Sequence, residues 1–231
     1  MQTRANSSRE RILSTAEAMI LKGGFAATTI EDIIDKAAIT KGGFFYHFEG
    51  KRELARALVE RYIEMDTQVF RELSERADSL SENPLQRTLI FLNLFAEMVA
   101  GMTEVHPGCL VASFTYETQQ FDDDIRQRME HGILEWRSMI SARLMEIVAT
   151  RTPRIEVSID ALADMFTSTV EGGIILARIY DDNQALVAQV QSYRSYLRLL
   201  FDDVQTAQFT ITEAGVEAAL QRGPSTGRNS G

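Results

Sequence analysis

The chain has 231 residues, with 24 Lys and Arg against 33 Asp and Glu, so its formal net charge is −9. This length fits one large or two modest domains, and the single cysteine excludes disulfide bonds within the chain. Because there is no signal peptide and no run of about 18 uninterrupted apolar residues, we expect a cytoplasmic protein without a membrane span.

The charge is distributed unevenly along the chain. Residues 1–56 hold nine Lys and Arg against seven Asp and Glu, whereas the remaining residues hold 15 against 26. All four lysines lie at or before position 51. A mildly basic N-terminal part beside an acidic body favours binding of a polyanion at the N-terminal part alone.

The first predicted helix begins at Ser7, because Ser7 and Glu10 have the spacing of a capping box. Its apolar residues recur with helical period, and Gly23 is expected to end it. Residues 1–6 are expected to be a loose arm, whose arginine either contacts phosphate groups or stays solvated.

Residues 25–54 have the pattern of two short helices joined by a tight turn. Thr28 stands three residues before Glu31, the spacing of a capping box, and Thr40 is a good N-cap for the second helix. Phe44 is expected to pack inward. The outward residues supply hydroxyls, a cation and an aromatic ring, which suit phosphates and base edges: Thr40, Lys41, Gly43, Tyr46 and His47. The segment therefore predicts a helix-turn-helix DNA reader.

Helical periodicity continues through the rest of the chain without a strand pattern, so the expected fold class is all-α. A long helix follows Gly50, and its apolar stripe includes Met65. Asn83 and Pro84 begin a buried central helix that extends to Met102. The remaining predicted elements are a short segment at 109–118 and helices at 122–149, 158–180, 183–207 and 210–221.

Residues 28–54 resemble the DNA-binding domain of TetR-type (TetR/AcrR-like) bacterial transcriptional regulators. The recognition-helix form [ST]-K-G-x-[LF]-Y-x-H-F is matched from Thr40 to Phe48, except that its tyrosine position holds Phe45 and a tyrosine follows at Tyr46. The resemblance implies a homodimeric regulator, most often a repressor, that a small-molecule effector releases from a palindromic operator in double-stranded DNA. The DNA contacts that it implies are Thr28, Thr29, Thr40, Lys41, Gly42, Gly43, Tyr46, His47 and Lys51.

The resemblance also divides the chain into regions. We expect a helix-turn-helix domain at 7–52, a helical ligand-binding and dimerisation domain at 53–209, and a short helix with a disordered tail at 210–231. The last two long helices are expected to form an antiparallel hairpin that pairs with its own copy, with close approach at Gly172 and Gly173. The alternative functions are an activator or a constitutive DNA binder without a ligand.

Aromatic and methionine side chains at helical spacing in the body either line an effector cavity or form ordinary core. The candidates for the cavity, with one acidic residue, are Phe91, Phe95, Met98, Met102, Phe114, Glu117, Trp136, Met139 and Phe166. With few fixed charges on these walls, the effector is expected to be largely apolar or cationic. Cys109 opens a predicted helix, where the dipole could lower the thiol pKa and make a redox sensor; the alternative is a small buried residue.

Motifs for catalysis are missing from the sequence. The three histidines have no metal-ligand spacing, and there is no P-loop, GxGxxG or GxSxG. We therefore expect neither an enzyme nor a bound metal or cofactor. An enzyme body would need a polar cluster able to turn over a substrate, and a scaffold body would expose a large apolar surface after dimerisation.

Overall fold

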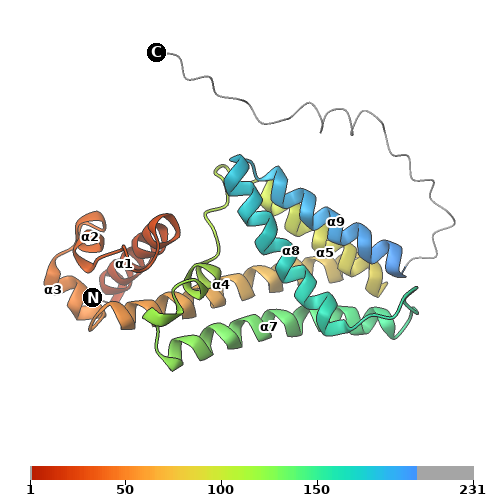
Figure 1. Cartoon of the computed structure of the whole chain (residues 1–231), viewed down its shortest axis with the longest axis horizontal. Helices are drawn as coiled ribbons and strands as arrows, with labels where there is room; N and C mark the ends of the chain where they lie inside the picture. The colour runs from red at the N-terminus through yellow and green to blue at the C-terminus, as the bar shows by residue number, and fades with distance from the viewer. Residues whose placement is uncertain (1, 202–231) are drawn as a thin grey trace, which may run out of the picture. The chain divides into compact units, whose positions relative to one another are not determined.

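The computed structural model describes residues 2–201, with side chains from Ser7 onward, and all longer elements in this part are α-helices (Figure 1). The all-α prediction is confirmed. The helices are α1 (Gln2–Gly23), α2 (Ile30–Lys36), α3 (Lys41–His47), α4 (Lys51–Leu80), α5 (Pro84–Ala100), α6 (Leu110–Thr115), α7 (Asp123–Val148), α8 (Ile159–Tyr180) and α9 (Gln184–Phe201), with a 3-10 turn at Thr118–Gln120. Residues 202–207 of the helix predicted at 183–207, the predicted helix at 210–221 and the tail lie outside the described residues.

Two predicted helix starts were wrong. Helix α1 begins at Gln2 instead of Ser7, so residues 2–6 are helical and not a loose arm. Residues 2–6 contain no glycine or proline, and Gln2, Arg4 and Ala5 favour a helix. The helix therefore extends N-terminal to the capping signal at Ser7. Helix α2 is capped by Thr29 instead of Thr28, since the Thr29 hydroxyl accepts a hydrogen bond from the Asp32 amide at 3.1 Å.

The three N-terminal helices share one small core with the beginning of α4. Ile12 of α1, Ile33 of α2, Phe44 of α3 and Leu58 of α4 are completely buried. Helix α4 then continues without a break to Leu80, so a single helix crosses the expected domain boundary at residues 52 and 53. Residues up to Phe201 form one compact unit.

Helix α5 lies at the centre of the body, where it packs against α4, α7 and α9. Asn83 caps it through a 3.1 Å bond from the Gln86 amide, and Pro84 follows at the first helical position, as predicted. The predicted stripe of α4 was wrong at Met65, which is 52% exposed. Asp66 faces the body instead, because it lies one helical turn from Tyr62.

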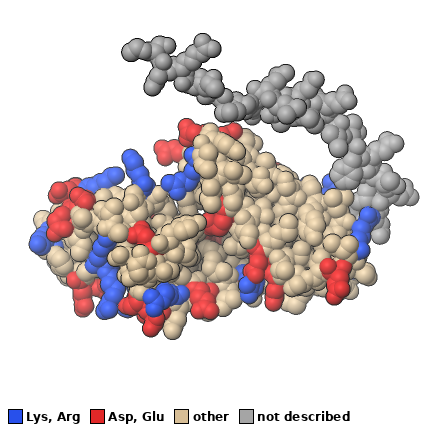
Figure 2. Space-filling view, viewed as in Figure 1, with Lys and Arg blue, Asp and Glu red and all other residues tan. Residues whose placement is uncertain are grey.

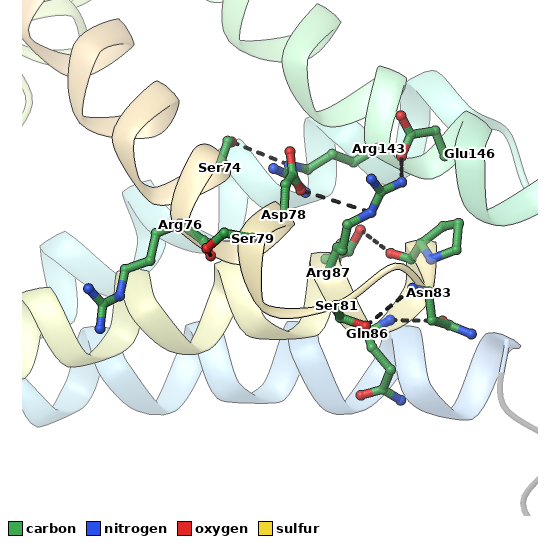
Figure 3. Close-up of polar contacts among 12 residues, drawn as sticks. Ser74, Arg76, Asp78, Ser79, Ser81, Asn83, Gln86, Arg87, Arg143 and Glu146 are labelled. Atoms are coloured by element: carbon green, nitrogen blue, oxygen red, sulfur yellow. Dashed lines mark hydrogen bonds and ion pairs between the residues drawn. The ribbon is translucent and has the colours of Figure 1, made fainter.

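Polar contacts hold the far end of α4 against α7 (Figure 3). Arg143 of α7 donates to the Ser74 hydroxyl at 3.3 Å and to the Asp78 carboxylate at 3.0 Å, both on α4. Arg87 of α5 pairs with Glu146 of α7 at 2.5 Å. The Arg143 side chain is only 11% exposed, so solvent screens its ion pair less than it screens a surface pair. These contacts anchor the end of α4 that is distant from α3.

Candidate functional site

The outward face of α3 presents the side chains that sequence analysis selected. Lys41 and Gly42 are exposed, and Tyr46 is 78% exposed, while Phe44 on the opposite face is completely buried. The Thr40 hydroxyl caps the helix by accepting from the Gly43 amide at 3.0 Å, and Thr40 is itself exposed. Phe45, at the family's tyrosine position, is 45% exposed.

The two glycines of α3 differ in what surrounds them. A side chain at Gly42 would meet nothing within 4 Å, whereas a Cβ at Gly43 would lie 3.2 Å from the Thr40 hydroxyl oxygen. Glycine costs a helix about 1 kcal/mol relative to alanine. The open space at Gly42 therefore leaves room for the close approach of another molecular surface to the backbone.

Three of the predicted contact residues face protein groups. Thr28 is 3% exposed and donates to the Gly24 carbonyl at 2.9 Å, so a direct contact with DNA from its hydroxyl is excluded in this conformation. His47 is half-buried, and its Nε2 lies 2.8 Å from the Ser8 hydroxyl of α1. Lys51 donates from Nζ to the Phe25 carbonyl at 2.5 Å.

Lys51 also interacts with the Phe25 ring and with the Glu117 carboxylate. Its Nζ lies 4.3 Å from the centroid of the Phe25 ring, a cation–π distance. Burial lowers the pKa of this ammonium, and the nearby Glu117 carboxylate opposes that shift. Lys51 therefore binds the turn between α1 and α2 from the side of α4.

Charged side chains of both signs surround α1–α3, as Figure 2 shows, whereas the surface over α8 and α9 is mostly uncharged in the same view. Arg9 of α1 lies beside α3, with its guanidinium 5.5 Å from the Phe48 ring centroid. Interspersed charge gives a mild local field, so binding of a polyanion here depends on the particular side chains of α3.

A cavity of about 290 Å³ lies in the body, lined from α4, α5, α7 and α8 and by the segment before α6. Five of the predicted residues line it: Phe95, Met98, Met102, Trp136 and Phe166. Its volume is at the lower end of the range of ligand pockets, roughly 300–1,000 Å³.

Four predicted cavity residues do not line it. The Phe91 ring is turned toward the Arg143 guanidinium, 5.2 Å from its centroid, and Met139 packs on the core. Phe114 stacks on Phe121 at 4.4 Å between centroids, beside Phe25 of the N-terminal helices. Helical periodicity identifies an apolar face, but it does not tell core from cavity wall.

Glu117, the fourth of these residues, links the body to the N-terminal helices. Its carboxylate accepts hydrogen bonds from the backbone amides of Phe25 at 2.7 Å and Ala26 at 2.8 Å. The turn at residues 25–26 is thus held by Glu117 through its amides and by Lys51 through its carbonyls. Nothing in the spacing of the sequence indicated this contact.

Polar groups also stand in the cavity wall, and two of them, Tyr62 and Asp66, were not expected there from the sequence. Tyr62 and Asp66 of α4 line it together with His106, Cys109 and Glu171. Burial, together with the Glu17 and Glu171 carboxylates, raises the pKa of Asp66 to about 7. Burial likewise raises the pKa of Glu171. In the sequence, the sign that Asp66 faces the cavity was its position four residues after Tyr62, within an apolar stripe.

Cys109 is a buried thiol that caps α6. Its sulfur accepts a hydrogen bond from the Ala112 amide at 3.4 Å. The helix dipole does not dominate, because burial and the neighbouring Glu171 raise the thiol pKa to about 12. The expected lowering of its pKa was therefore wrong, and the geometry favours the small buried residue over a reactive sensor.

The α8–α9 hairpin has an open face made of small and apolar side chains. On each helix these residues recur at steps of three or four: Met165, Ser168, Gly172, Ile175 and Ile179 on α8, and Ala188, Ser192, Ser195 and Leu199 on α9. Gly173 lies on the opposite side, where a Cβ would come within 2.6 Å of Leu186. The two adjacent glycines therefore serve different contacts, and Gly173 serves the hairpin within one chain.

Residues 2–201 contain neither a membrane-spanning helix nor a cluster suited to a metal ion. In this part of the chain no helix is both long and apolar enough to cross a membrane. Within the same residues, no group of three or more His, Cys, Asp and Glu side chains has the arrangement of a metal site.

Comparison with known proteins agrees with this architecture. A family profile described as bacterial regulatory proteins of the tetR family matches residues 12–58, and one described as a tetracyclin repressor-like C-terminal domain matches residues 84–193. The regulator TtgR of Pseudomonas putida is 27% identical over 82% of this chain and 89% of its own length. The repressor DhaR of Mycobacterium sp. is 23% identical over 77% of this chain and 86% of its own.

Solved structures share the fold. A TetR transcriptional regulator from Chloroflexus aurantiacus superimposes with a TM-score of 0.70 at 27% identity, over 87% of this chain and 98% of that one. An N-terminal helix-turn-helix and a helical C-terminal body define a DNA-binding transcriptional regulator, which is not an enzyme. This chain belongs to the TetR family of bacterial transcriptional regulators, as its recognition helix predicted.

Proposed function

We propose that this regulator is a repressor that binds a near-palindromic operator as a homodimer and is released from it by a small molecule. Repression, as opposed to activation, is supported by the similarity to DhaR, which is named a transcriptional repressor. The cavity in the body favours an effector-responsive regulator over a constitutive DNA binder.

The observation that carries the proposal is the exposed face of α3. Its hydroxyl, cation and aromatic side chains stand over a buried Phe44, and Gly42 leaves the backbone open. In the proposed complex α3 enters the major groove, with contacts from Thr29, Thr40, Lys41, Gly42, Gly43 and Tyr46. His47 and Lys51 support this surface from behind, through Ser8 and the turn at residues 25–26.

The open face of α8 and α9 is the proposed dimer interface. Small residues on both helices let two copies approach closely, and a twofold axis then presents two α3 helices to DNA. A separation of about 34 Å between the two readers would match successive major grooves.

Release would follow from a change in the distance between the readers. Helix α4 carries Tyr62 and Asp66 at the cavity and continues to the helix-turn-helix. Glu117, after α6, holds the turn at residues 25–26. An effector that prefers one position of these helices would shift the population toward the form that does not fit the operator.

Replacement of Lys41 tests the DNA contact. Lys41→Ala should weaken binding to duplexes selected from a random pool by the wild-type protein, because one phosphate or base contact is lost. The slope of log K against log[salt] should fall by roughly 0.9 if the contact is to phosphate. A mobility-shift titration at several salt concentrations measures both.

Lys22→Ala is the matched control. Lys22 is also exposed and its replacement removes the same charge, but it lies at the opposite end of α1 from Ser8, roughly 20 Å away by helical rise. It should leave the slope almost unchanged. Equal effects of the two substitutions would mean that only net charge matters and would remove α3 as the reader.

A further inference from the structure

Four titratable side chains form a connected group on one side of the cavity. The Tyr62 side chain lies beside Asp66 and the Cys109 thiol, and the thiol lies beside Glu171. These residues come from α4, the N-cap of α6 and α8. The two carboxyl groups thus have a neutral phenol and a neutral thiol as neighbours in this group, although each ionised carboxylate can accept about four hydrogen bonds.

No lysine or arginine is among the described residues that line this cavity. Two nearby arginines are occupied elsewhere: Arg61 pairs with Glu17, and Arg178 donates to the Leu21 carbonyl at 3.1 Å. His106 also lines the cavity, but burial and then the charge of Arg178 lower its pKa, which favours the neutral ring. Above neutral pH the cavity thus holds uncompensated negative charge, which is costly in a buried position.

The remaining wall is aromatic. The rings of Phe70, Phe95 and Phe166 pack together, with centroids 5.9 Å to 6.0 Å from one another. The Trp136 ring stands edge-on to Phe70 at 6.4 Å. Aromatic faces carry negative potential and attract organic cations, and they also accept flat apolar groups.

We propose that the ligand of this cavity is an organic cation, with an apolar or aromatic body against Phe95, Trp136 and Phe166 and its ammonium group beside Asp66 and Glu171. The identification of the cavity as the effector site rests on the proposed function. The class of ligand rests on the carboxyl pair and the aromatic wall. An anionic ligand would add charge of the same sign, and a neutral ligand would leave the carboxylates unpaired.

A cation binds the ionised form of Asp66, so its affinity depends on pH. Asp66 is surrounded by Tyr62 on its own helix, by Glu17 of α1 and by Glu171 of α8, and its pKa is raised to about 7. Below that pH a cation must first displace a proton. Its affinity should therefore fall by up to about tenfold for each pH unit below 7, while the affinity of a neutral ligand stays constant.

Three compounds of similar shape separate the ligand classes: benzyltrimethylammonium, its uncharged isostere 2,2-dimethylpropylbenzene, and the anion 3-phenylpropanoate. Binding to the full-length protein is followed through Trp136, the only tryptophan of the chain, and checked by calorimetry. At pH 8 the cation should bind at least about tenfold more tightly than the isostere, equivalent to one pKa unit of interaction. The ratio of the affinity for the cation to that for the isostere should be smaller at pH 5.5.

Single substitutions test whether Asp66 and Glu171 cause the preference for the cation. Asp66→Asn and Glu171→Gln should each lower the affinity for the cation severalfold and leave that for the isostere unchanged. Glu64→Gln is the matched control, since Glu64 is exposed on α4 outside this cavity and the change in charge is the same. Circular dichroism confirms that each variant is folded.

Each outcome has a defined meaning. Equal or tighter binding of the isostere or the anion overturns the proposal, as does a cation preference that survives both cavity substitutions. Absence of binding by all three compounds to the folded protein overturns it too. A selective cation that leaves the protein–operator complex intact supports the ligand class and contradicts the proposed function instead.

Discussion

Asp66 is a carboxyl group whose ionisation opposes folding. Its pKa is raised from 3.8 to about 7, so the ionised form is disfavoured in the folded chain. A raised acid pKa means that the folded state holds its proton to higher pH than the unfolded state does. The stability of the fold therefore falls as pH rises from 3.8 to about 7, and no further change from this residue follows above that pH.

Asp66→Asn should consequently stabilise the protein at pH 8 and leave it almost unchanged at pH 4. Asparagine keeps the shape of the side chain and can accept a hydrogen bond, but it carries no charge. The expected gain at pH 8 is on the order of 2 kcal/mol, after allowance for partial solvation. Thermal unfolding of both proteins at one protein concentration measures the difference, and a gain equal at pH 4 and pH 8 would contradict it.

At the scale of elements, the turn at residues 25–26 is the point at which the body contacts the helix-turn-helix. Glu117 accepts from both amides of this turn, and Lys51 donates to both carbonyls. Phe25 packs edge-on against Phe114 of α6 at 5.3 Å. Polar and apolar contacts thus coincide at this turn, so we expect a displacement of α6 to move the end of α1.

Glu117→Gln should loosen this turn. A glutamine oxygen can accept one of the two amides, and its NH₂ group faces the other amide without an acceptor. We expect a loss of about 1–3 kcal/mol and faster hydrogen exchange at the amides of Phe25 and Ala26. Exchange monitored by NMR measures this, with Glu130→Gln as a control on the exposed surface of α7. Unchanged protection of both amides would show that Glu117 does not hold the turn.

At the scale of the whole molecule, the open face of α8 and α9 would determine how the two α3 helices are spaced in the proposed dimer. Ile175 and Ile179 are 50% and 70% exposed on this face within one chain. Burial of such side chains between two copies would contribute roughly 25 cal/mol for each Å² of apolar area. A closed twofold pair is the simplest arrangement that covers the same face on both copies.

Ile175→Glu should convert the dimer into a folded monomer, because dimerisation would bury two unpaired carboxylates near the twofold axis. Operator affinity should fall with it, since one reader then binds without its partner. Light scattering measures the molar mass. Leu134→Glu places the same charge on exposed α7 and should change neither quantity. A dimeric Ile175→Glu protein would mean that another surface pairs the two copies.

Gly173 shows why a local pattern does not assign a face. The sequence suggested that both adjacent glycines lie at the pairing surface, but Gly173 packs against Leu186 of the same chain. A bulky residue there would test the folding of the hairpin, and Gly172 is the glycine on the open side. Adjacent helical residues point about 100° apart, so only the packing of α8 on α9 decides which one faces outward.

The sequence by itself determined the fold class, the extent of most body helices and the recognition helix. These follow from local physics: helical period, caps such as Thr40, Asn83 and Ser158, and the residue types of α3. The assignment to the TetR family rests on the same local pattern and is confirmed.

Only the tertiary structure decided which polar groups meet. The pairing of Glu117 with the turn at residues 25–26 joins positions more than 90 residues apart in the chain. The cavity wall likewise brings Asp66 to Cys109 and Glu171, and burial there reverses the pKa expected for a thiol at a helix N-terminus. Ionisation depends on the burial and charges that surround a group in space, and the residue's neighbours along the chain do not specify them.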